Sequence, residues 1–192
     1  MRTGFLGGTF DPVHLGHLVL GESAREQLSL DRVLFVPTGH SWRKPDRVIT
    51  PAEHRVTMLR LAIEDNAAFD VSLLEVERPG PSYTVVTLEQ MKAERPEEEI
   101  FFILGRDALA DLPHWHRPER ILALATLAVA DRPGAAEPGA PLPEARLQAV
   151  DMPAIGITGT DLRERVRDGR SVRYQVPASV EAYIRRHRLY VA

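Results

Sequence analysis

The sequence predicts an α/β fold, a Rossmann-like parallel sheet with helices on both faces. Apolar runs of strand length alternate with helical patterns through most of its 192 residues, which is typical of βαβ units around a parallel sheet. The first apolar run leads directly into a glycine-rich turn and then a helical segment, an arrangement in which α/β proteins bind phosphate. The length suits one sizeable domain and is short for two.

The strands are predicted from short apolar runs bounded by turn-forming residues. Since helical patterns separate most of these runs, parallel pairing is expected. The last run has the weakest pattern. The predicted strands cover residues 2–6, 32–36, 71–76, 100–104, 126–130 and 147–150.

The clearest helix signal covers residues 51–65. Thr50 is placed to form a capping box with Glu53, Pro51 takes the first helical position, and apolar residues follow at helical spacing. Further helices are predicted over residues 84–94, 161–168 and 177–187.

Residues 1–192 are expected to form a single domain. A stretch rich in Pro, Gly and Ala at about residues 131–146 cannot supply a packed face, so we predict a mobile surface loop there. Residues from about 160 to 192 are predicted to form a small helical subregion. The basic stretch 38–45 follows the second predicted strand and is a candidate lid over a ligand at the carboxyl ends of the strands.

Composition describes an ordinary globular protein, with 44% hydrophobic and 27% charged residues and a net charge of −3. This balance predicts neither a nucleic-acid partner nor a membrane partner. The chain contains no Cys, which excludes disulfides, thiol catalysis and cysteinyl metal sites. The start of the sequence lacks the long apolar core of a signal peptide, so a cytoplasmic location is expected.

The most informative segment runs from Gly7 to His17, with the sequence GGTFDPVHLGH. Glycines let the backbone approach an anion, and the first N–H groups of the following helix add a positive field. His14 and His17 lie three residues apart, so on a helix they share one face and can reach the same oxygens. The segment matches neither a P-loop nor the dinucleotide-binding glycine pattern. A metal site is disfavoured because no third ligand has a suitable spacing.

A second segment, from Ile157 to Arg163, places small hydroxyl residues at the start of a helix with an Arg one turn in. Taken alone, Thr158 and Thr160 fit ordinary helix caps, and Arg163 fits a solvated side chain. Together with the first segment, they indicate a second phosphate anchor, where N–H groups, hydroxyls and a guanidinium converge on phosphate oxygens.

These two segments resemble the nucleotidyltransferase superfamily that carries the His-x-Gly-His signature, which implies the nucleotidylyl transferase fold. Within it, further segments are similar to the bacterial nicotinate-nucleotide adenylyltransferases, and the resemblance spans nearly the whole chain. These segments are residues 78–88, 101–109, 112–116, 131–134 and 173–177.

The resemblance implies two groups of site residues. His14, His17 and Arg163 are the implied catalytic residues: His17 contacts the α-phosphate, His14 the polyphosphate and Arg163 the leaving phosphates. The residues implied to bind ATP are Gly8, Thr9, Phe10, His14, His17, Gly105, Asp107, Ile157, Thr158, Thr160 and Arg163. The residues implied to bind nicotinate mononucleotide are Thr9, Lys44, Tyr83, Thr84, Trp115 and Arg132.

The acceptor residues have physical roles that fit a pyridine mononucleotide. The indole of Trp115 can stack on an electron-poor ring, and otherwise fills the core or anchors a surface. Tyr83 and Thr84 begin a helix, so their backbone N–H groups can bind the ring carboxylate. Arg132 can pair with the mononucleotide, and as a lone Arg after a strand it otherwise fits an exposed side chain. Lys44 can close a loop over the phosphates of ATP.

Four positions depart from the family pattern. Arg43 stands where a His is usual, in the run from Ser41 to Lys44, and Val86 stands where Asp is frequent. Arg106 replaces a small residue. Gly159 replaces a Ser and supplies only backbone. These departures bear on individual contacts and leave the reaction class unchanged.

The implied reaction joins ATP and nicotinate mononucleotide to give nicotinate adenine dinucleotide and pyrophosphate. Because a 5′-phosphate is largely ionised at neutral pH, no general base is required. Mg²⁺ is expected with ATP and is held mainly by substrate phosphates, so no protein metal ligand is predicted.

Alternatives remain open at this point. The acceptor can instead be nicotinamide mononucleotide or a phosphopantetheine, or the chain can be a nucleotide sensor that turns nothing over. Apolar Val180, Tyr183 and Ile184 on the last helix suit either the core or a homo-oligomer contact.

Overall fold

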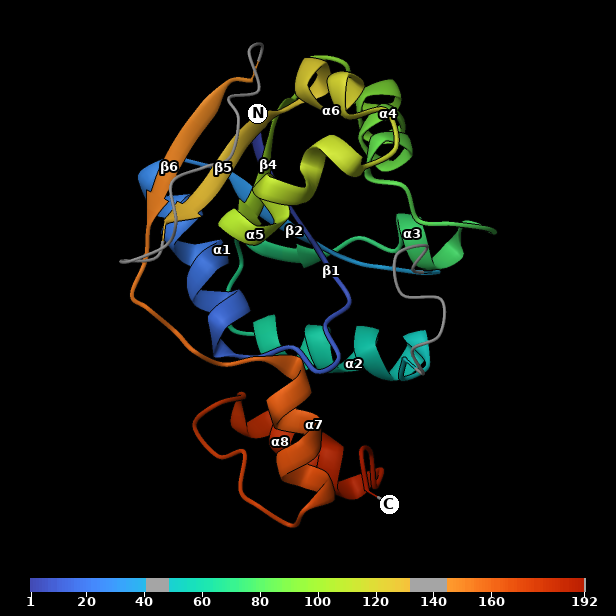
Figure 1. Cartoon of the computed structure of the whole chain (residues 1–192), viewed down its shortest axis with the longest axis vertical. Coiled ribbons are helices and arrows are strands. Elements are labelled where there is room, and N and C mark those ends of the chain that lie inside the picture. Colours follow the sequence, from blue (N-terminus) through green and yellow to red (C-terminus); the bar gives the residue numbers. More distant parts are fainter. Residues whose placement is uncertain (41–48, 132–144, 192) are drawn as a thin grey trace.

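The computed structural model describes residues 1–40, 49–131 and 145–191, in which six parallel strands form one sheet (Figure 1). The strand order is β3-β2-β1-β4-β5-β6, so the direction of winding reverses between β1 and β4. This order is that of the Rossmann fold, whose ligands bind at the carboxyl ends of the strands beside the reversal. The strands are β1 (Arg2–Gly8), β2 (Arg32–Pro37), β3 (Phe69–Val71), β4 (Glu99–Gly105), β5 (Thr126–Asp131) and β6 (Leu147–Asp151).

The predicted strands are confirmed except for one. The strand expected over residues 71–76 covers Phe69–Val71, and a short helix follows at once. β3 is an edge strand that pairs only with residues 33–35 of β2, so its ladder ends where that pairing ends. Leu74 packs instead against the core beneath helix α4. A short apolar run does not by itself distinguish a strand from a buried helical turn.

The helices fall close to their predicted ranges, and the helix over residues 84–94 is confirmed as predicted. The capping box at Thr50 is wrong: helix α2 begins after Pro51, and no side chain caps it. The backbone of Thr50 instead bonds Asp11 and Arg55. The helices are α1 (Leu15–Gln27), α2 (Ala52–Ile63), α3 (Leu74–Glu77), α4 (Thr84–Glu94), α5 (Arg106–Asp111), a 3-10 turn (Leu112–His114), α6 (Pro118–Leu124), α7 (Gly159–Arg167) and α8 (Ala178–Arg186).

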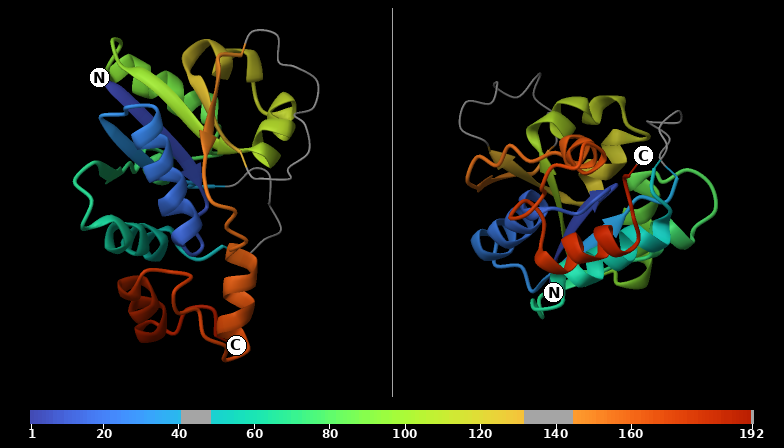
Figure 2. Two further views of the ribbon diagram at one scale, coloured as in Figure 1. Left: turned by 90° about the vertical axis from the view of Figure 1, so that its left-hand side faces the viewer. Right: turned by 90° about the horizontal axis from the view of Figure 1, so that it is seen from below.

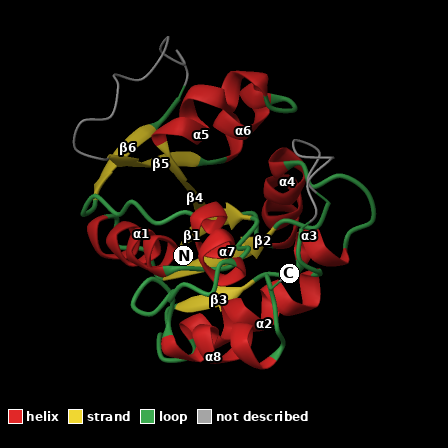
Figure 3. Ribbon diagram, turned by 60° about the horizontal axis from the view of Figure 1, so that its bottom comes forward, coloured by secondary structure: helices red, strands yellow, loops and turns green. Residues whose placement is uncertain are grey.

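Helices cover both faces of the sheet, as predicted (Figure 3). Successive strand residues point to opposite faces. Accordingly, Phe35 and Ile103 belong to a core shared with α1 and α2, whereas Leu34 and Phe102 belong to a core shared with α4, α5 and α6.

Helices α7 and α8 form the predicted small subregion beyond α2 (Figures 1 and 2). Their buried residues Leu162, Val180 and Ile184 join the same apolar cluster as Leu59 of α2. The single domain over residues 1–192 stays a prediction. Val180 and Ile184 are therefore core residues of their own chain. No helix within the described residues is long and apolar enough to cross a membrane.

Candidate functional site

The glycine-rich turn lies where β1 ends, beside the reversal of the sheet. We call residues 7–17 the phosphate-binding turn. Phe10 within it has a left-handed backbone (φ 50°), and its side chain is buried against Phe35 and the edge of the His17 ring. Because this side chain is buried, the ATP contact that the resemblance implies for Phe10 can involve only its backbone. The Asp11–Pro12 peptide bond is cis.

The two histidines of the turn lie together at the start of α1. Their rings stack with centroids 3.7 Å apart, and the backbone N–H of His14 donates to Nδ1 of His17 at 3.2 Å. Gly16 makes this arrangement possible, because a Cβ there would lie 3.0 Å from Nδ1 of His14. The spacing predicted from the sequence thus brings both imidazoles to one face.

The protonation state of His17 follows from this geometry. Burial, and then the nearby His14, hold the pKa of His17 well below its ordinary value, so the ring is neutral at neutral pH. Because Nδ1 accepts the His14 N–H, the single ring proton resides on Nε2. His17 therefore offers one N–H donor from a fixed tautomer.

The lowered pKa predicts how stability depends on pH. Above about pH 6.5 both the folded and the unfolded state hold neutral His17, and the contribution to stability is complete. As the pH falls below 6.5, the unfolded state takes up the proton first, so the free energy of unfolding decreases, with a slope of up to about 1.4 kcal/mol per pH unit. Urea unfolding of the parent and of His17→Gln across this window measures the difference. Parallel pH profiles for the two proteins would contradict the assignment.

The second anchor forms the start of α7. Oγ1 of Thr158 accepts the N–H of Asp161 at 3.1 Å, so Thr158 is a helix cap, and the hydroxyl of Thr160 accepts from Nη2 of Arg163 at 3.2 Å. Gly159 fits a close approach, because a Cβ there would lie 3.0 Å from the carbonyl oxygen of Asp11. This contact gives a structural reason for Gly at a position where the family often has Ser.

Arg163 joins the two anchors across a sequence separation of 152 residues. Its Nη1 donates to the carbonyl of Asp11 at 2.6 Å. A guanidinium carries five N–H donors, so the two bonds to Asp11 and Thr160 leave others for phosphate oxygens. The structure therefore brings His14, His17 and Arg163 to one side of the β1 carboxyl end.

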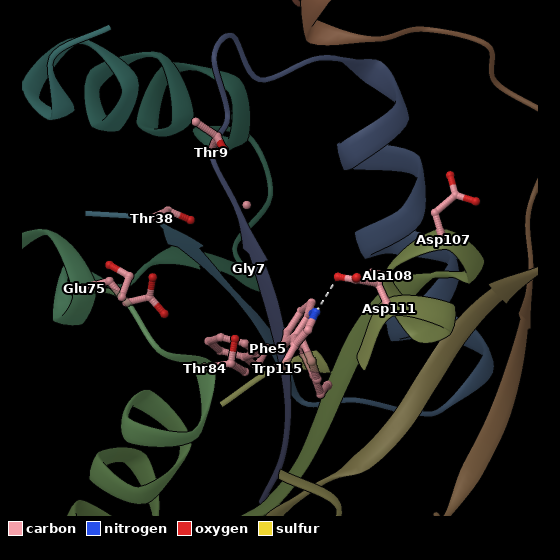
Figure 4. A pocket seen from close by; sticks show the side chains of 13 residues that line it. Phe5, Gly7, Thr9, Thr38, Glu75, Thr84, Asp107, Ala108, Asp111 and Trp115 are labelled. Carbon is pink, nitrogen blue, oxygen red and sulfur yellow. Dashed lines mark hydrogen bonds between the residues drawn. The ribbon is translucent and has the colours of Figure 1, made fainter. Parts of the chain in front are cut away.

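A cavity of about 620 Å³ opens beside this turn, between the carboxyl ends of β1 and β4 (Figure 4). Thr84 and Glu75 lie on one side of β1 in this view, and Asp107 and Asp111 lie on the other. The indole of Trp115 lies between them. Predicted residues that line the cavity are Gly8, Thr9, Thr84, Asp107 and Trp115.

Trp115 is held in place by its neighbours. Its Nε1 donates to Oδ2 of Asp111 at 2.8 Å, and its ring lies 5.9 Å from that of Phe102. The half-buried indole thus presents a fixed apolar surface to the cavity. Trp115 both packs against the core and lines the cavity, and its contact with a pyridine ring stays a prediction.

The start of α4 corrects one predicted contact. The N–H of Tyr83 donates to the carbonyl of Pro81 at 3.1 Å, so it is used within the chain. The first helical residues are Thr84 and Val85, whose N–H groups a helix leaves without an intrahelical partner. The ring of Tyr83 lies 4.4 Å from that of His116.

Several predicted residues lie apart from these two groups. Gly105 ends β4, with open space where a Cβ would be, and Ile157 packs against the core beside α7. Val86 also packs on the core, and Arg106 begins α5. Lys44, Arg43 and Arg132 lie outside the described residues, as does most of the segment 131–146.

Four polar residues near the site were not predicted from the sequence: Asp11, Arg55 and Glu75 are buried, and Tyr190 is half-buried. Burial raises the pKa of Glu75, which accepts a hydrogen bond from Thr87 at 2.8 Å at the cavity wall. The carboxylate of Asp11, in a turn predicted to bind phosphate, is a usable signal in the sequence, because such a charge requires a donor or cation nearby. Arg55 is a second usable signal, because it lies on the same helix face as the apolar Leu59 and a buried charge requires hydrogen-bond partners.

Comparisons with known proteins agree with this geometry. A family model described as cytidylyltransferase-like matches residues 5–165. A probable nicotinate-nucleotide adenylyltransferase of Roseiflexus sp. is 50% identical, with 97% of this chain and 96% of the relative covered. One of Thermus thermophilus is 48% identical, with 99% of this chain and 100% of the relative covered.

Solved structures show the same fold. The Plasmodium falciparum nicotinic acid mononucleotide adenylyltransferase complexed with NaAD superposes with a TM-score of 0.82 at 17% identity, covering 98% of this chain and 97% of that one. The crystal structure titled "a Putative Nicotinate-nucleotide Adenylyltransferase from Vibrio parahaemolyticus" gives a TM-score of 0.73 at 20% identity, covering 98% of this chain and 94% of that one. From the full-length sequence matches, the chain belongs to the nicotinate-nucleotide adenylyltransferase family of cytidylyltransferase-like proteins.

Proposed function

We propose that the chain transfers the adenylyl group of ATP to nicotinate mononucleotide, giving nicotinate adenine dinucleotide and pyrophosphate in NAD biosynthesis. The observation that carries this proposal is one turn that holds the stacked His14 and His17, is bonded by Arg163 at Asp11, and lines with Gly8 and Thr9 a cavity that Trp115 and Thr84 also line. One side of the β1 carboxyl end then holds the phosphates of ATP, and the other side holds the acceptor.

The transfer is an in-line displacement at the α-phosphorus of ATP. An oxygen of the acceptor 5′-phosphate forms the new bond, and the bond from the α-phosphorus to the bridging oxygen of the β-phosphate breaks, releasing pyrophosphate. The attacking phosphate is largely ionised at neutral pH, so the histidines need not remove a proton. Catalysis consists of alignment and of stabilising the charge that develops on the phosphoryl oxygens.

We assign each donor to a part of this displacement. Nε2–H of His17 donates to the α-phosphate, His14 contacts the polyphosphate, and Arg163 stabilises the departing pyrophosphate. The neutral state of His17 suits this role, because the hydrogen bond from the His14 N–H to Nδ1 keeps the single ring proton on Nε2. Lys44 is proposed to close a loop over the phosphates of ATP, and Arg132 is proposed to pair with the mononucleotide.

Mg²⁺ is proposed to arrive with ATP and to be held mainly by the substrate phosphates. Among residues 1–40, 49–131 and 145–191, no three His, Asp or Glu side chains are grouped to hold a metal. Mg²⁺ retains waters and takes many of its anionic ligands from substrate phosphates, so a dedicated protein site is not required. When bound, the ion supplies neutralising charge on the phosphates.

Selection of the acceptor is proposed to depend on two features of the cavity. Trp115 provides the surface on which a pyridine ring stacks. The N–H groups of Thr84 and Val85 at the start of α4 are proposed to donate to the carboxylate of the nicotinate ring. A nicotinamide ring carries a neutral amide in place of the carboxylate and gains less from the helix terminus.

The proposal is tested by pyrophosphate release from Mg²⁺-ATP. Nicotinate mononucleotide, nicotinamide mononucleotide and phosphopantetheine are offered separately, and the highest kcat/KM is expected for the nicotinate form. Preference for another acceptor would retain adenylyl transfer and overturn the cavity assignments. ATP binding without release from any acceptor would identify a nucleotide sensor instead. Cytoplasmic location remains a prediction from the sequence.

A further inference from the structure

A tyrosine near the carboxyl end of the sequence reaches the phosphate-binding turn. The hydroxyl of Tyr190 donates to Oδ1 of Asp11 at 2.7 Å, and the N–H of Thr50 contacts Oδ2 at 3.4 Å. Asp11 is buried, with 5% of its surface exposed. A carboxylate of the turn is therefore held by residues that lie 39 and 179 positions away in the sequence.

Arg55 of α2 completes this cluster. Its guanidinium donates through Nε to the carbonyl of Thr50, through Nη1 to that of Thr9 and through Nη2 to that of Thr38, each at 2.8 Å. The side chain is buried, with 2% exposed. Burial lowers the pKa of Arg55, and the negative charge of Asp11 opposes that change. Three separate segments are thus fixed by one cation whose charge Asp11 balances.

The cluster acts on the backbone that is to hold ATP. Arg55 fixes the carbonyl of Thr9, Arg163 fixes that of Asp11, and Phe10 between them keeps a left-handed conformation that is unfavourable for a bulky side chain. Such a conformation persists only where its surroundings determine it. The turn also lies directly above α7 (Figure 1). The C-terminal subregion contacts Asp11 of the turn through Arg163 and Tyr190, and the carbonyl of Gln175 accepts the N–H of Leu15 at 3.0 Å.

We propose that Tyr190 is a positioning residue for the ATP site, acting through Asp11 and Arg55 on the phosphate-binding turn. The hydroxyl donates to a buried carboxylate, and its loss leaves that charge with less compensation inside the protein. Asp11 then takes a replacement hydrogen bond from Arg55 or from water. The three hydrogen bonds from Arg55 to backbone carbonyls weaken as a result. This inference rests on the proposed function, in that the turn is taken to hold the phosphates of ATP.

Tyr190 stays protonated throughout the useful pH range. Burial and the adjacent Asp11 carboxylate raise the pKa of Tyr190 well above its ordinary value. The hydroxyl of Tyr190 therefore donates to Asp11 at every pH at which the enzyme is assayed. Only a substitution removes this hydrogen bond.

The test compares Tyr190→Phe with Tyr183→Phe, two changes that each remove one phenolic hydroxyl from the same subregion. The hydroxyl of Tyr183 pairs with Nδ1 of His54 at 2.9 Å, and this pair lies outside the cluster around Asp11. Tyr190→Phe is expected to raise the Kd for Mg²⁺-ATP about tenfold, with Tyr183→Phe within about twofold of the parent. The KM for the acceptor is expected to stay unchanged in both.

Calorimetric titration with Mg²⁺-ATP measures the Kd without requiring turnover, so the outcome is independent of which acceptor the enzyme uses. Equal losses of melting temperature in both variants, with unchanged ATP affinity in Tyr190→Phe, would show a purely structural role and overturn the proposal. A parent that fails to bind ATP at all would instead overturn the proposed function.

A second variant keeps the proposal testable if Tyr190→Phe does not fold. Asp11→Asn removes the charge that Tyr190 compensates, and it is expected to weaken ATP binding by a similar factor. Asp11→Asn with the Kd of the parent would overturn the proposal. Where both single variants fold, Tyr190→Phe should change the Kd by less than about twofold in the Asp11→Asn background, since the two residues act as a unit. Full additivity of the two effects would contradict the inference.

Discussion

The His17→Ala variant is expected to lose about a hundredfold to a thousandfold in kcat for pyrophosphate release, the range measured for removal of one transition-state donor. The neutral ring offers a single N–H from Nε2, held by the bond from the His14 backbone to Nδ1. Steady-state rates with saturating Mg²⁺-ATP and nicotinate mononucleotide measure the loss.

The control for this variant is His187→Ala, which removes an exposed imidazole stacked on Tyr183 in the C-terminal subregion. It is expected to retain the kcat of the parent. Turnover of His17→Ala within about threefold of the parent would place the α-phosphate contact elsewhere. Circular dichroism of both variants separates a loss of chemistry from a loss of fold.

Replacing Arg163 with alanine is expected to reduce kcat by about a hundredfold, because a charge-assisted donor to the leaving phosphates is removed. The same change breaks the bond from Nη1 to the Asp11 carbonyl, so the KM for ATP should rise as well. Arg163→Lys is expected to recover only part of both losses, since an ammonium group lacks the fork that spans two acceptors. Initial rates over a range of ATP concentrations measure both parameters.

Arg165→Ala provides the matched control on the same helix. Nε of Arg165 donates to the carbonyl of Ser171, away from the turn. This variant should keep the kinetic parameters of the parent and show at most a small change in melting temperature. Equal kinetic losses in Arg163→Ala and Arg165→Ala would indicate that α7 contributes only general positive charge.

Much of the fold follows from local patterns. The strands were found because buried parallel strands form apolar runs, and the Gly7–His17 segment was found because its chemistry is contiguous in sequence. β3 was misplaced because the length of an edge strand is set by its partner, here β2, and not by its own residues.

The parts of the site that the sequence did not reveal depend on distant contacts. Asp11 is contiguous with the histidines, yet its role depends on Tyr190, which follows 179 residues later. The capping box predicted for α2 is absent for a related reason. The N–H of Thr50 donates to Asp11, and the carbonyl of Thr50 accepts from Arg55. Local patterns describe a helix end in isolation, whereas tertiary hydrogen bonds decide which groups remain available to cap it.

The strand order also determines when each half of the site can form during synthesis. The wall of the cavity, from Glu75 to Trp115, is encoded in the middle of the chain and needs only the first four strands. The nucleotide half joins Asp11 to Arg163 and Tyr190, at separations of 152 and 179 residues. Closing such long loops is entropically costly and slow relative to local contacts. A nascent chain therefore has the residues of the acceptor wall well before it has those that complete the ATP site.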